Sequence, residues 1–236
     1  MVKGSAVIAR LSVMKIPLCF QITFTAAVGY ILKSQSLDSG TIYLFLGVFL
    51  LASGAAALNN FQDRSLDASI GRTQNRPIPS GLIDPNSVLI QGAILVILGT
   101  LVLALTSDNF LSPVLGISAV VFYNLLYTPI KRYSIYAIIP GVICGMIPPY
   151  LGWIHAGGEP FSYFIILLAT IVGIWQIPHY WIILMQYQQD YRKSKVIPTF
   201  LRVFDDGQIK RTLFVWIMSF ACLTLLPVMV GLVTYP

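Results

Sequence analysis

The sequence predicts an all-α membrane protein, a polytopic bundle of about seven transmembrane helices. Hydrophobic residues make up 56% of its 236 residues and charged residues only 10%, whereas soluble domains usually carry about 25% charged residues. Apolar runs of roughly 20 residues, the length needed to cross the hydrocarbon core of a bilayer, recur along the whole chain. We therefore expect one transmembrane domain over residues 1–236.

The elements follow in chain order from these apolar runs. The first run could be mistaken for a signal peptide, but it lacks a convincing small-residue cleavage site and further runs follow, so it is predicted to be a retained helix. The second run ends in a stretch rich in amides and carboxylates, and the seventh follows Asp205 and Asp206, which are expected to cap its start. The predicted spans are residues 16–33, 40–60, 86–106, 111–128, 135–154, 162–187 and 212–234.

Lysine and arginine residues predict the orientation of the spans. Fourteen of the 15 such residues lie in the N-terminus and in the connections between spans two and three, four and five, and six and seven, which share one side of the membrane. Only Lys33 lies on the other side. The positive-inside rule places these basic segments in the cytoplasm and the C-terminus on the opposite face. We expect a bacterial or archaeal cytoplasmic membrane. The net charge of +6 then reflects topology and not binding to nucleic acid, and topology alone is taken to explain Lys3, Arg10 and Lys15.

Acidic residues gather on the same predicted side of the membrane. Six aspartates lie in the basic connections, whereas the opposite loops hold only Asp38, Asp108 and Glu159. Acidic residues contribute little to orientation, so their clustering requires another explanation. The six are Asp63, Asp67, Asp84, Asp190, Asp205 and Asp206.

The first candidate site is a polar stripe at the end of the second predicted span. Asn59, Asp63 and Asp67 are spaced four positions apart, so on a helix they form one stripe along the axis. Carboxylate and amide oxygens are the hard ligands that Mg²⁺ accepts, and Mg²⁺ often completes its shell with substrate phosphate oxygens. The stripe therefore suits a metal-bound diphosphate, although an ordinary solvated helix end would show the same spacing.

Two basic pairs lie on the same face as this stripe. Arg72 and Arg76 follow it in the next connection, and Lys131 and Arg132 close the fourth span after Tyr127. Arginine fits phosphate oxygens with its planar fork, and a basic pair can stabilise the charge that develops on a leaving diphosphate. Alternatively, these residues are membrane anchors, with Tyr127 in an interfacial aromatic belt.

The sixth span carries the third candidate site, WQIPHYW from Trp175 to Trp181. If a helix continues from Pro178, a residue well tolerated at a first helical position, then His179, Gln186 and Asp190 share one face. A polar stripe in an apolar run is costly unless it faces a cavity or a partner, which makes it a candidate site. A structural hydrogen-bonding role for the histidine is the alternative.

Four stretches of this sequence together resemble a known family. NNFQDRSLDASIGRTQNRP, which begins at Asn59, resembles the first aspartate-rich motif of the membrane-embedded aromatic prenyltransferases. YTPIKR, GVICGMIPPYLGW, and WQIPHYW followed by DYRKSKVIPTF are similar to its protohaem farnesyltransferase branch, the haem O synthases. The motifs stand in the expected order over residues 50 to 215, approximately.

The resemblance implies an all-helical bundle around a lipid-accessible cavity and transfer of a prenyl group from its diphosphate, with Mg²⁺. It implies metal ligation by Asn59, Asp63, Asp67 and Asp190, catalytic roles for Asp63, Asp67, Lys131, His179 and Asp190, and substrate contacts from Asn59, Arg72, Arg76, Tyr127, Arg132, Trp181 and Gln186. In the haem branch, the region of His179 is expected to face the porphyrin. The implied partners are farnesyl diphosphate, protohaem and membrane lipid, and a homo-oligomer is left open.

Two features depart from the family pattern. Gln186 stands where the second motif usually has an acidic residue, and the family typically has nine spans, so this chain resembles a nine-helix bundle without the last two. The expected reaction joins farnesyl to a vinyl group of protohaem, giving haem O. The alternatives are an aromatic quinone precursor as acceptor, or a reduced, non-catalytic homologue that binds haem or lipid. A small transporter is disfavoured, because no internal repeat is evident and the polar clusters lie at one membrane face.

Overall fold

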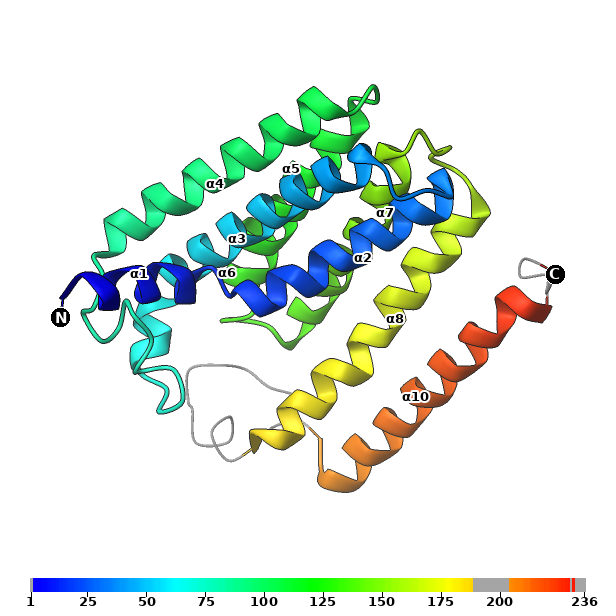
Figure 1. Cartoon of the computed structure of the whole chain (residues 1–236). Coiled ribbons are helices and arrows are strands. Elements are labelled where there is room, and N and C mark those ends of the chain that lie inside the picture. Colours follow the sequence, from blue (N-terminus) through cyan, green and yellow to red (C-terminus); the bar gives the residue numbers. More distant parts are fainter. Residues whose placement is uncertain (1, 189–203, 230, 232–236) are drawn as a thin grey trace.

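The computed structural model of the chain is a helical bundle, and its described residues contain seven helices that are long and apolar enough to cross a membrane. The structure describes residues 2–188, 204–229 and 231, and these ranges contain no β-strand. The predictions of an all-α fold and of seven spans are therefore confirmed. Figure 1 shows the helices lying side by side, with α8 and α10 forming one flank of the bundle.

The helices follow the predicted order, with three differences at their ends. The first span is preceded by a short separate helix, α1, the second is longer than expected, and the seventh begins at Asp206 instead of at residue 212. The sixth continues through Pro178, in agreement with its predicted range of 162–187. The elements are α1 (Val2–Val13), α2 (Ile16–Ser34), α3 (Ser39–Ala68), α4 (Pro85–Thr106), α5 (Leu111–Val120), the π-helix η1 (Val121–Tyr127), α6 (Thr128–Ile130), the 3₁₀ helix η2 (Ile135–Ala137), α7 (Ile138–His155), α8 (Tyr163–Gln186) and α10 (Asp206–Met229).

Aspartate side chains begin three of the membrane helices. The carboxylates of Asp38 and Asp84 accept hydrogen bonds from backbone amides in the first turns of α3 and α4. Asp205 accepts one from the Gln208 amide at 2.8 Å, at the start of α10. Such caps satisfy amides that have no partner inside the helix. The expected capping of the seventh span is thus confirmed for Asp205.

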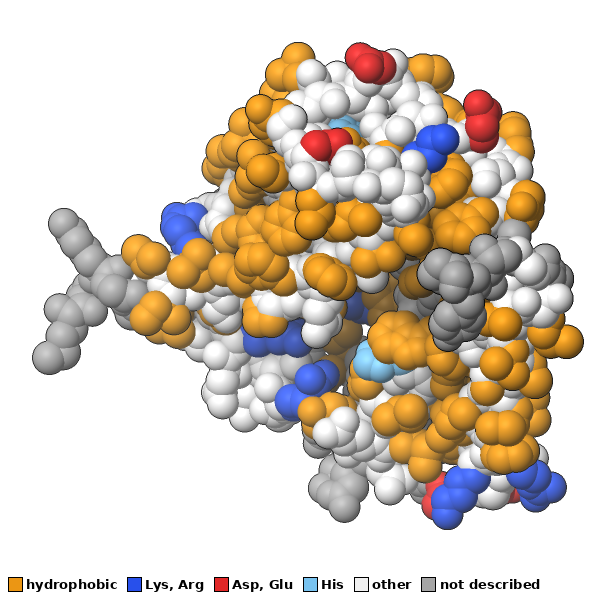
Figure 2. All heavy atoms as spheres, turned by 45° about the vertical axis from the view of Figure 1, so that its right-hand side comes forward, with side chains coloured by type: hydrophobic (Ala, Val, Ile, Leu, Met, Phe, Trp, Pro, Cys, Tyr) orange, Lys and Arg blue, Asp and Glu red, His pale blue; other side chains and the backbone are white. Residues whose placement is uncertain are grey.

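Successive connections alternate between the two ends of the bundle. The turn between α1 and α2, the connection from α3 to α4, the residues after α6 and the C-terminus of α8 lie at one end, which we call the basic end (Figure 1). The connections from α2 to α3, α4 to α5 and α7 to α8 lie at the opposite end. Figure 2 shows hydrophobic side chains over most of the visible face and acidic side chains at its upper and lower ends. This distribution suits a protein whose middle lies in lipid.

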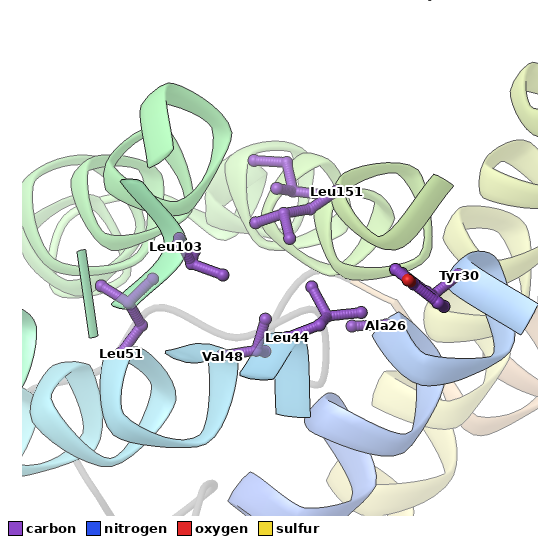
Figure 3. Close-up of a cluster of buried hydrophobic side chains, with 8 residues drawn as sticks. Ala26, Tyr30, Leu44, Val48, Leu51, Leu103 and Leu151 are labelled. Atoms are coloured by element: carbon purple, nitrogen blue, oxygen red, sulfur yellow. The ribbon is translucent and has the colours of Figure 1, made fainter. Parts of the chain in front are cut away.

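The core forms where α2, α3, α4 and α7 meet. Ala26 and Tyr30 of α2 lie against Leu44 and Val48 of α3, with Leu103 and Leu151 from the other two helices (Figure 3). Helices in a membrane associate mainly through close van der Waals packing, because lipid tails are as apolar as the side chains. The cluster therefore fixes how α3 is held against its neighbours.

Glycine residues bring α3 and α4 into backbone contact. Gly47 and Gly54 of α3 face Gly99 and Gly92 of α4, and a Cβ added at any of the four would meet atoms of the facing helix within 3 Å. Small residues at such contacts are typical of membrane helix pairs. The long helix α3 is thereby anchored along much of its length, which holds its polar end in a fixed position.

Replacing Gly54 with alanine is expected to destabilise the bundle. An added Cβ would lie 2.8 Å from the Gly92 carbonyl oxygen, and overpacking of this kind typically costs about 1–3 kcal/mol. Thermal unfolding in detergent micelles should show a lower midpoint for Gly54→Ala than for the wild type. Gly71→Ala is the control, since no atom lies within 4 Å of its added Cβ. Equal midpoints for the two variants would contradict a tight contact between α3 and α4.

Candidate active site

The polar stripe predicted from the sequence lies on the last turns of α3. Asn59, Asp63 and Asp67 are only 2%, 3% and 5% exposed, and the Asn59 amide donates to Asp63 Oδ2 at 2.8 Å. The three side chains thus form one stripe, as their spacing predicts. Because they are buried, the alternative of an ordinary solvated helix end is wrong. Buried carboxylates need charged or hydrogen-bonding partners, and the structure supplies them.

Two basic residues at the end of the fourth span are partners of Asp63. Lys131 Nζ and Arg132 form ion pairs with the two carboxylate oxygens of Asp63, the arginine at 3.1 Å. The Asn59 amide also donates to Thr128 Oγ1 at 3.0 Å, which ties α6 to α3. One turn earlier, Asn124 donates to the Ala55 carbonyl at 3.0 Å. The span is π-helical from residue 121 to 127, a conformation frequent at functional sites.

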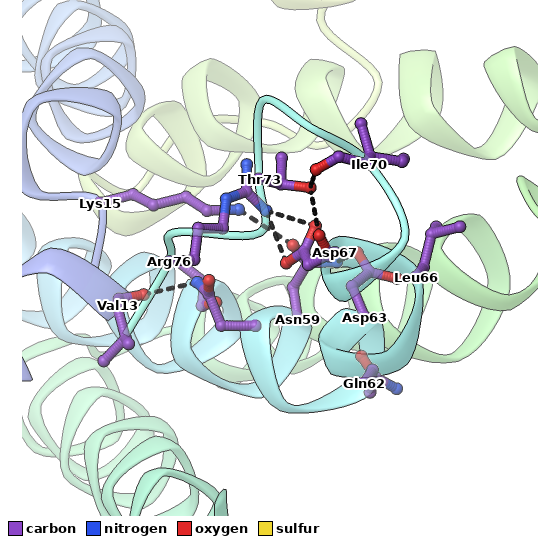
Figure 4. A network of polar contacts seen from close by, with 12 residues as sticks. Val13, Lys15, Asn59, Gln62, Asp63, Leu66, Asp67, Ile70, Thr73 and Arg76 are labelled. Atoms are coloured by element: carbon purple, nitrogen blue, oxygen red, sulfur yellow. Dashed lines mark hydrogen bonds and ion pairs between the residues drawn. The ribbon is translucent and has the colours of Figure 1, made fainter. Parts of the chain in front are cut away.

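The connection after α3 folds back over the stripe and supplies a third cation. Arg76 donates to both carboxylate oxygens of Asp67, at 2.9 and 2.8 Å. Thr73 Oγ1 donates to the Asp67 carbonyl at 2.8 Å and holds the connection in place. Figure 4 shows Arg76, from the connection after α3, and Lys15, from the turn between α1 and α2, both pointing toward the stripe. Arg76 thus lies at the stripe, and its predicted contact with a diphosphate stays a prediction.

Lys15 is a site residue that the sequence analysis missed. Its Nζ donates to Asn59 Oδ1 at 2.9 Å, so the interpretation that topology alone explains this lysine is wrong. Lys15 lies in the turn between α1 and α2 in a left-handed conformation, with φ 51° and ψ 49°, which is uncommon for a residue with a side chain. A lysine before a membrane span is what topology predicts, so no sequence signal singles it out.

The assembled site has an excess of positive charge. Two carboxylates, those of Asp63 and Asp67, are faced by four cationic side chains among the described residues: Lys15, Arg76, Lys131 and Arg132. Such a site attracts a polyanion, and guanidinium groups match phosphate oxygens well. The geometry therefore supports binding of a diphosphate at the basic end.

The same residues offer a fitting set of ligands for a hard divalent cation. Asn59 Oδ1 and the carboxylate oxygens of Asp63 and Asp67 lie on one face of α3. In this structure they accept hydrogen bonds from basic side chains. Oxygen ligands of this type suit Mg²⁺, which is usually bound by one or two carboxylates together with substrate phosphates. The donor set thus fits the metal that the resemblance implies.

Tyr127 and Arg72, also predicted as site residues, have their described contacts with aromatic rings and with Lys131. Tyr127 stacks on Tyr123 with ring centroids 5.6 Å apart, and Lys131 Nζ lies 5.4 Å from the Tyr127 ring centroid. The guanidinium of Arg72 lies 4.7 Å from the ring of Tyr187. Arg72 therefore links the α3–α4 connection to the C-terminal end of α8.

The predicted residues of the sixth span separate into different environments. The His179 side chain is exposed at the surface of the bundle and stacks on Trp175, with the two ring centroids 4.8 Å apart. Trp181 is buried, 4% exposed, in a cluster with Leu184 and Ile209 that joins α8 to α10. Its position supports a packing role.

The predicted shared face of this span depends on a helix that continues to position 190. α8 ends at Gln186, an exposed residue, and Tyr187 caps the helix. Asp190 lies outside the described residues. Within the described part of the chain, the predicted shared face can therefore be checked only for His179 and Gln186. These two residues lie on the same helix, two turns apart, which places them on one face.

Arg76→Ala is expected to destabilise the fold by leaving Asp67 without its cation. Breaking a buried pair costs about 3–5 kcal/mol, but the Arg76 side chain is 30% exposed, so solvent screening should reduce the loss to roughly 1–2 kcal/mol. Thermal unfolding of Arg76→Ala, Asp67→Asn and the double variant forms a double-mutant cycle. The double variant should recover part of the loss, whereas additive effects would exclude a coupled pair. Arg64→Ala is the control, because the contacts of Arg64 within the described part of the chain are with Phe61 and not with an aspartate.

Comparisons with known proteins identify the family and the fold of this chain. The chain matches the UbiA prenyltransferase family over residues 22–236. Among solved structures, it is similar to a UbiA homologue from Aeropyrum pernix K1, with TM-score 0.78 and 17% identity over 93% of this chain and 82% of that one. A UbiA homologue from Archaeoglobus fulgidus bound to GPP and Mg²⁺ gives TM-score 0.74 and 14% identity, over 91% and 76%. At these identities, the likeness concerns the fold.

Similar curated proteins carry the name protoheme IX farnesyltransferase. The protein of Nitratidesulfovibrio vulgaris strain DP4 is 38% identical over 77% of this chain and 62% of its own length. That of Geobacter sulfurreducens is 36% identical over 72% and 63%, and that of Cytophaga hutchinsonii 33% identical over 91% and 74%. The chain thus spans a little under two thirds of the length of the first two. From the family match and the helical architecture, this chain is a membrane protein that belongs to the UbiA prenyltransferase family.

Proposed function

We propose that this chain transfers a farnesyl group from farnesyl diphosphate to a vinyl group of protohaem, giving haem O, with Mg²⁺ as the cofactor. The observation that carries the proposal is the meeting of the buried Asn59, Asp63 and Asp67 stripe with four cationic side chains at one end of an apolar bundle. The names of the curated relatives favour protohaem as the acceptor.

The proposed site lies at the cytoplasmic face of a bacterial or archaeal membrane. The contacts of Asn59, Asp63 and Asp67 described above are at the basic end, where the positive-inside rule predicts cytoplasm. The diphosphate would remain near this surface, and its prenyl chain would extend into the apolar part of the bundle. A water-soluble head and an apolar tail thus each meet a matching environment.

Asn59, Asp63 and Asp67 would hold the metal, with Asp190 as a further ligand outside the described residues. Mg²⁺, when bound, would neutralise charge on the diphosphate and make it a better leaving group. Lys131, beside Asp63, would contact the departing diphosphate, and Arg132, Arg76 and Lys15 contact the same stripe. Arg72, in the connection after α3, is proposed as a further contact of the diphosphate.

The proposed reaction begins with cleavage of the bond between carbon 1 of the prenyl chain and the diphosphate oxygen. The bonding electrons move onto that oxygen, where Lys131 and Arg132 stabilise the charge. The terminal carbon of the haem vinyl group then attacks the allylic cation at carbon 1. The cation left on the inner vinyl carbon takes up water and loses a proton, so that the products are a hydroxyfarnesylethyl haem and diphosphate.

The exposed pair of aromatic rings on α8 is the proposed acceptor contact. His179 and Trp175 are stacked at an interplanar angle of 15° and present flat faces of the kind that pack against a planar macrocycle. Tyr127, close to Lys131, is proposed to line the same space. Gln186 would contact substrate from the end of α8, and the packing of Trp181 would hold this helix against α10.

A product assay tests the proposal. The purified chain in lipid nanodiscs would receive protohaem, farnesyl diphosphate and Mg²⁺, and the pigment would be analysed by mass spectrometry. We expect a hydroxyfarnesylethyl haem that is not formed when EDTA is added. Prenylation of 4-hydroxybenzoate in place of haem would support an aromatic acceptor. Haem binding without any prenylated product would support a non-catalytic homologue, and either result would overturn the proposed reaction.

A further inference from the structure

The N-terminal helix α1 is not required to cross the membrane. The first apolar segment covers Ala6–Ser34, but the left-handed turn at Lys15 divides it into α1 and α2. The 19 residues of α2 measure about 28 Å at 1.5 Å per residue, close to the roughly 30 Å of a hydrocarbon core. α1 is therefore surplus to the span and lies at the basic end.

α1 has two apolar faces, and the protein covers only one of them. Ala9 and Val13, four positions apart, are 4% and 1% exposed. On the other side of the helix, Val7, Ile8 and Leu11 are 59%, 68% and 45% exposed. Three large apolar side chains on adjacent positions of one helix face are costly to leave in water.

The attachment of α1 fixes which face points outward. Arg10 donates to Gln91 Oε1 at 3.0 Å, and Gln91 donates back to the Arg10 carbonyl at 3.2 Å. Gln91 lies in the second turn of α4, just inside the start of that span. The reciprocal contact therefore holds α1 beside the point where α4 enters the apolar layer.

We propose that the outward face of α1 docks on the headgroup region of an anionic membrane leaflet. Val7, Ile8 and Leu11 enter the boundary between headgroups and acyl chains, as the apolar faces of interfacial helices do. The charges fit an anionic surface, because α1 contains Lys3 and Arg10 and no acidic residue. The chain itself provides the proximity, since α2 enters the same leaflet directly after the turn at Lys15.

This docking places a lipid contact next to the candidate active site. The end of α1 leads through Met14 into Lys15, whose ammonium group contacts Asn59, and the Val13 carbonyl accepts a hydrogen bond from Asn60 at 2.9 Å. An α1 held on the leaflet therefore keeps Lys15 in position. The proposal does not depend on the identity of the prenyl acceptor.

Hydrogen–deuterium exchange of the full chain in nanodiscs tests the proposal. Discs of phosphatidylcholine alone would be compared with discs containing 30 mol%, approximately, of phosphatidylglycerol. We expect amides of residues 6–13 to exchange about tenfold more slowly in the anionic discs, because two cationic residues lie on α1. Identical exchange in the two lipids would overturn the proposal.

Variants separate the apolar and the electrostatic contributions. Arg10→Gln should remove much of the difference between the two lipids, and Val7→Ser/Ile8→Ser/Leu11→Ser should speed exchange of α1 in both. Leu82→Ser is the matched control, because Leu82 is also at the basic end and is 60% exposed, but lies outside α1. Amides in the α3–α4 contact should exchange as in the wild type in every variant, which would show that the bundle remains folded. A triple variant with wild-type exchange of α1 would contradict the proposal.

Discussion

Asp63→Asn is expected to lower kcat/KM for farnesyl transfer by about a thousandfold, the upper range for loss of one key electrostatic group. The substitution removes a proposed metal ligand and the carboxylate that pairs with both Lys131 and Arg132. Two cations would then lie together without their counter-ion, so both metal binding and the geometry of the diphosphate contact should suffer. The measurement is the rate of haem product formation in nanodiscs, with Mn²⁺ binding followed by electron paramagnetic resonance.

Asp84→Asn is the matched control for this variant. Asp84 is another aspartate at the basic end, and its carboxylate accepts a hydrogen bond from the Ser87 amide at 2.8 Å as the cap of α4. Asparagine caps helices about as well as aspartate, so activity and stability should stay close to wild type. If Asp63→Asn formed product at the rate of Asp84→Asn, the proposed role of the stripe would be wrong.

Lys131→Met is expected to lower kcat by about a hundredfold, with a smaller change in KM. The methionine keeps much of the apolar stem but removes the charge that would stabilise the departing diphosphate. Loss of the cation also leaves Asp63 with Arg132 as its remaining described ion pair, so the unfolding midpoint should be recorded beside the kinetics. Lys131→Arg should restore part of the rate, because it retains the charge but not the shape.

The control for the lysine is Lys33→Met at the opposite end of the bundle. Lys33 Nζ lies 5.6 Å from the ring centroid of Trp153 and makes no described contact with the stripe. Its replacement should change product formation by less than about twofold, because such an exposed cation–aromatic contact contributes little. Equal losses in the two methionine variants would indicate that only overall charge matters, and would remove Lys131 from the proposed mechanism.

Local sequence patterns were sufficient to predict the spans and the stripe. The length of each apolar run predicts a crossing, and the four-residue spacing of Asn59, Asp63 and Asp67 predicts a single face, because both depend only on the geometry of one helix. The capping role of Asp205 is equally local. The family resemblance found in the four motifs is confirmed by the match over residues 22–236.

Contacts between distant segments could not be predicted in this way. The sequence does not show that Lys15 reaches Asn59, 44 positions away, or that Lys131 reaches Asp63, 68 positions away. Nor does it distinguish the buried Trp181 from the exposed His179, which lie two positions apart in one motif. Each of these depends on which helices pack together and through which faces.

The sequence by itself determined the helical bundle, the seven spans that the described residues contain and the polar stripe at the end of the second span, because hydrophobic length and helical period are properties of single segments. Only the tertiary structure decided that the stripe is buried and that Lys15, Arg76, Lys131 and Arg132 converge on it. The physical reason is that burial and ion pairing depend on the spacing of helices, which here is set by small residues such as Gly54 and Gly92 at the backbone contacts between α3 and α4.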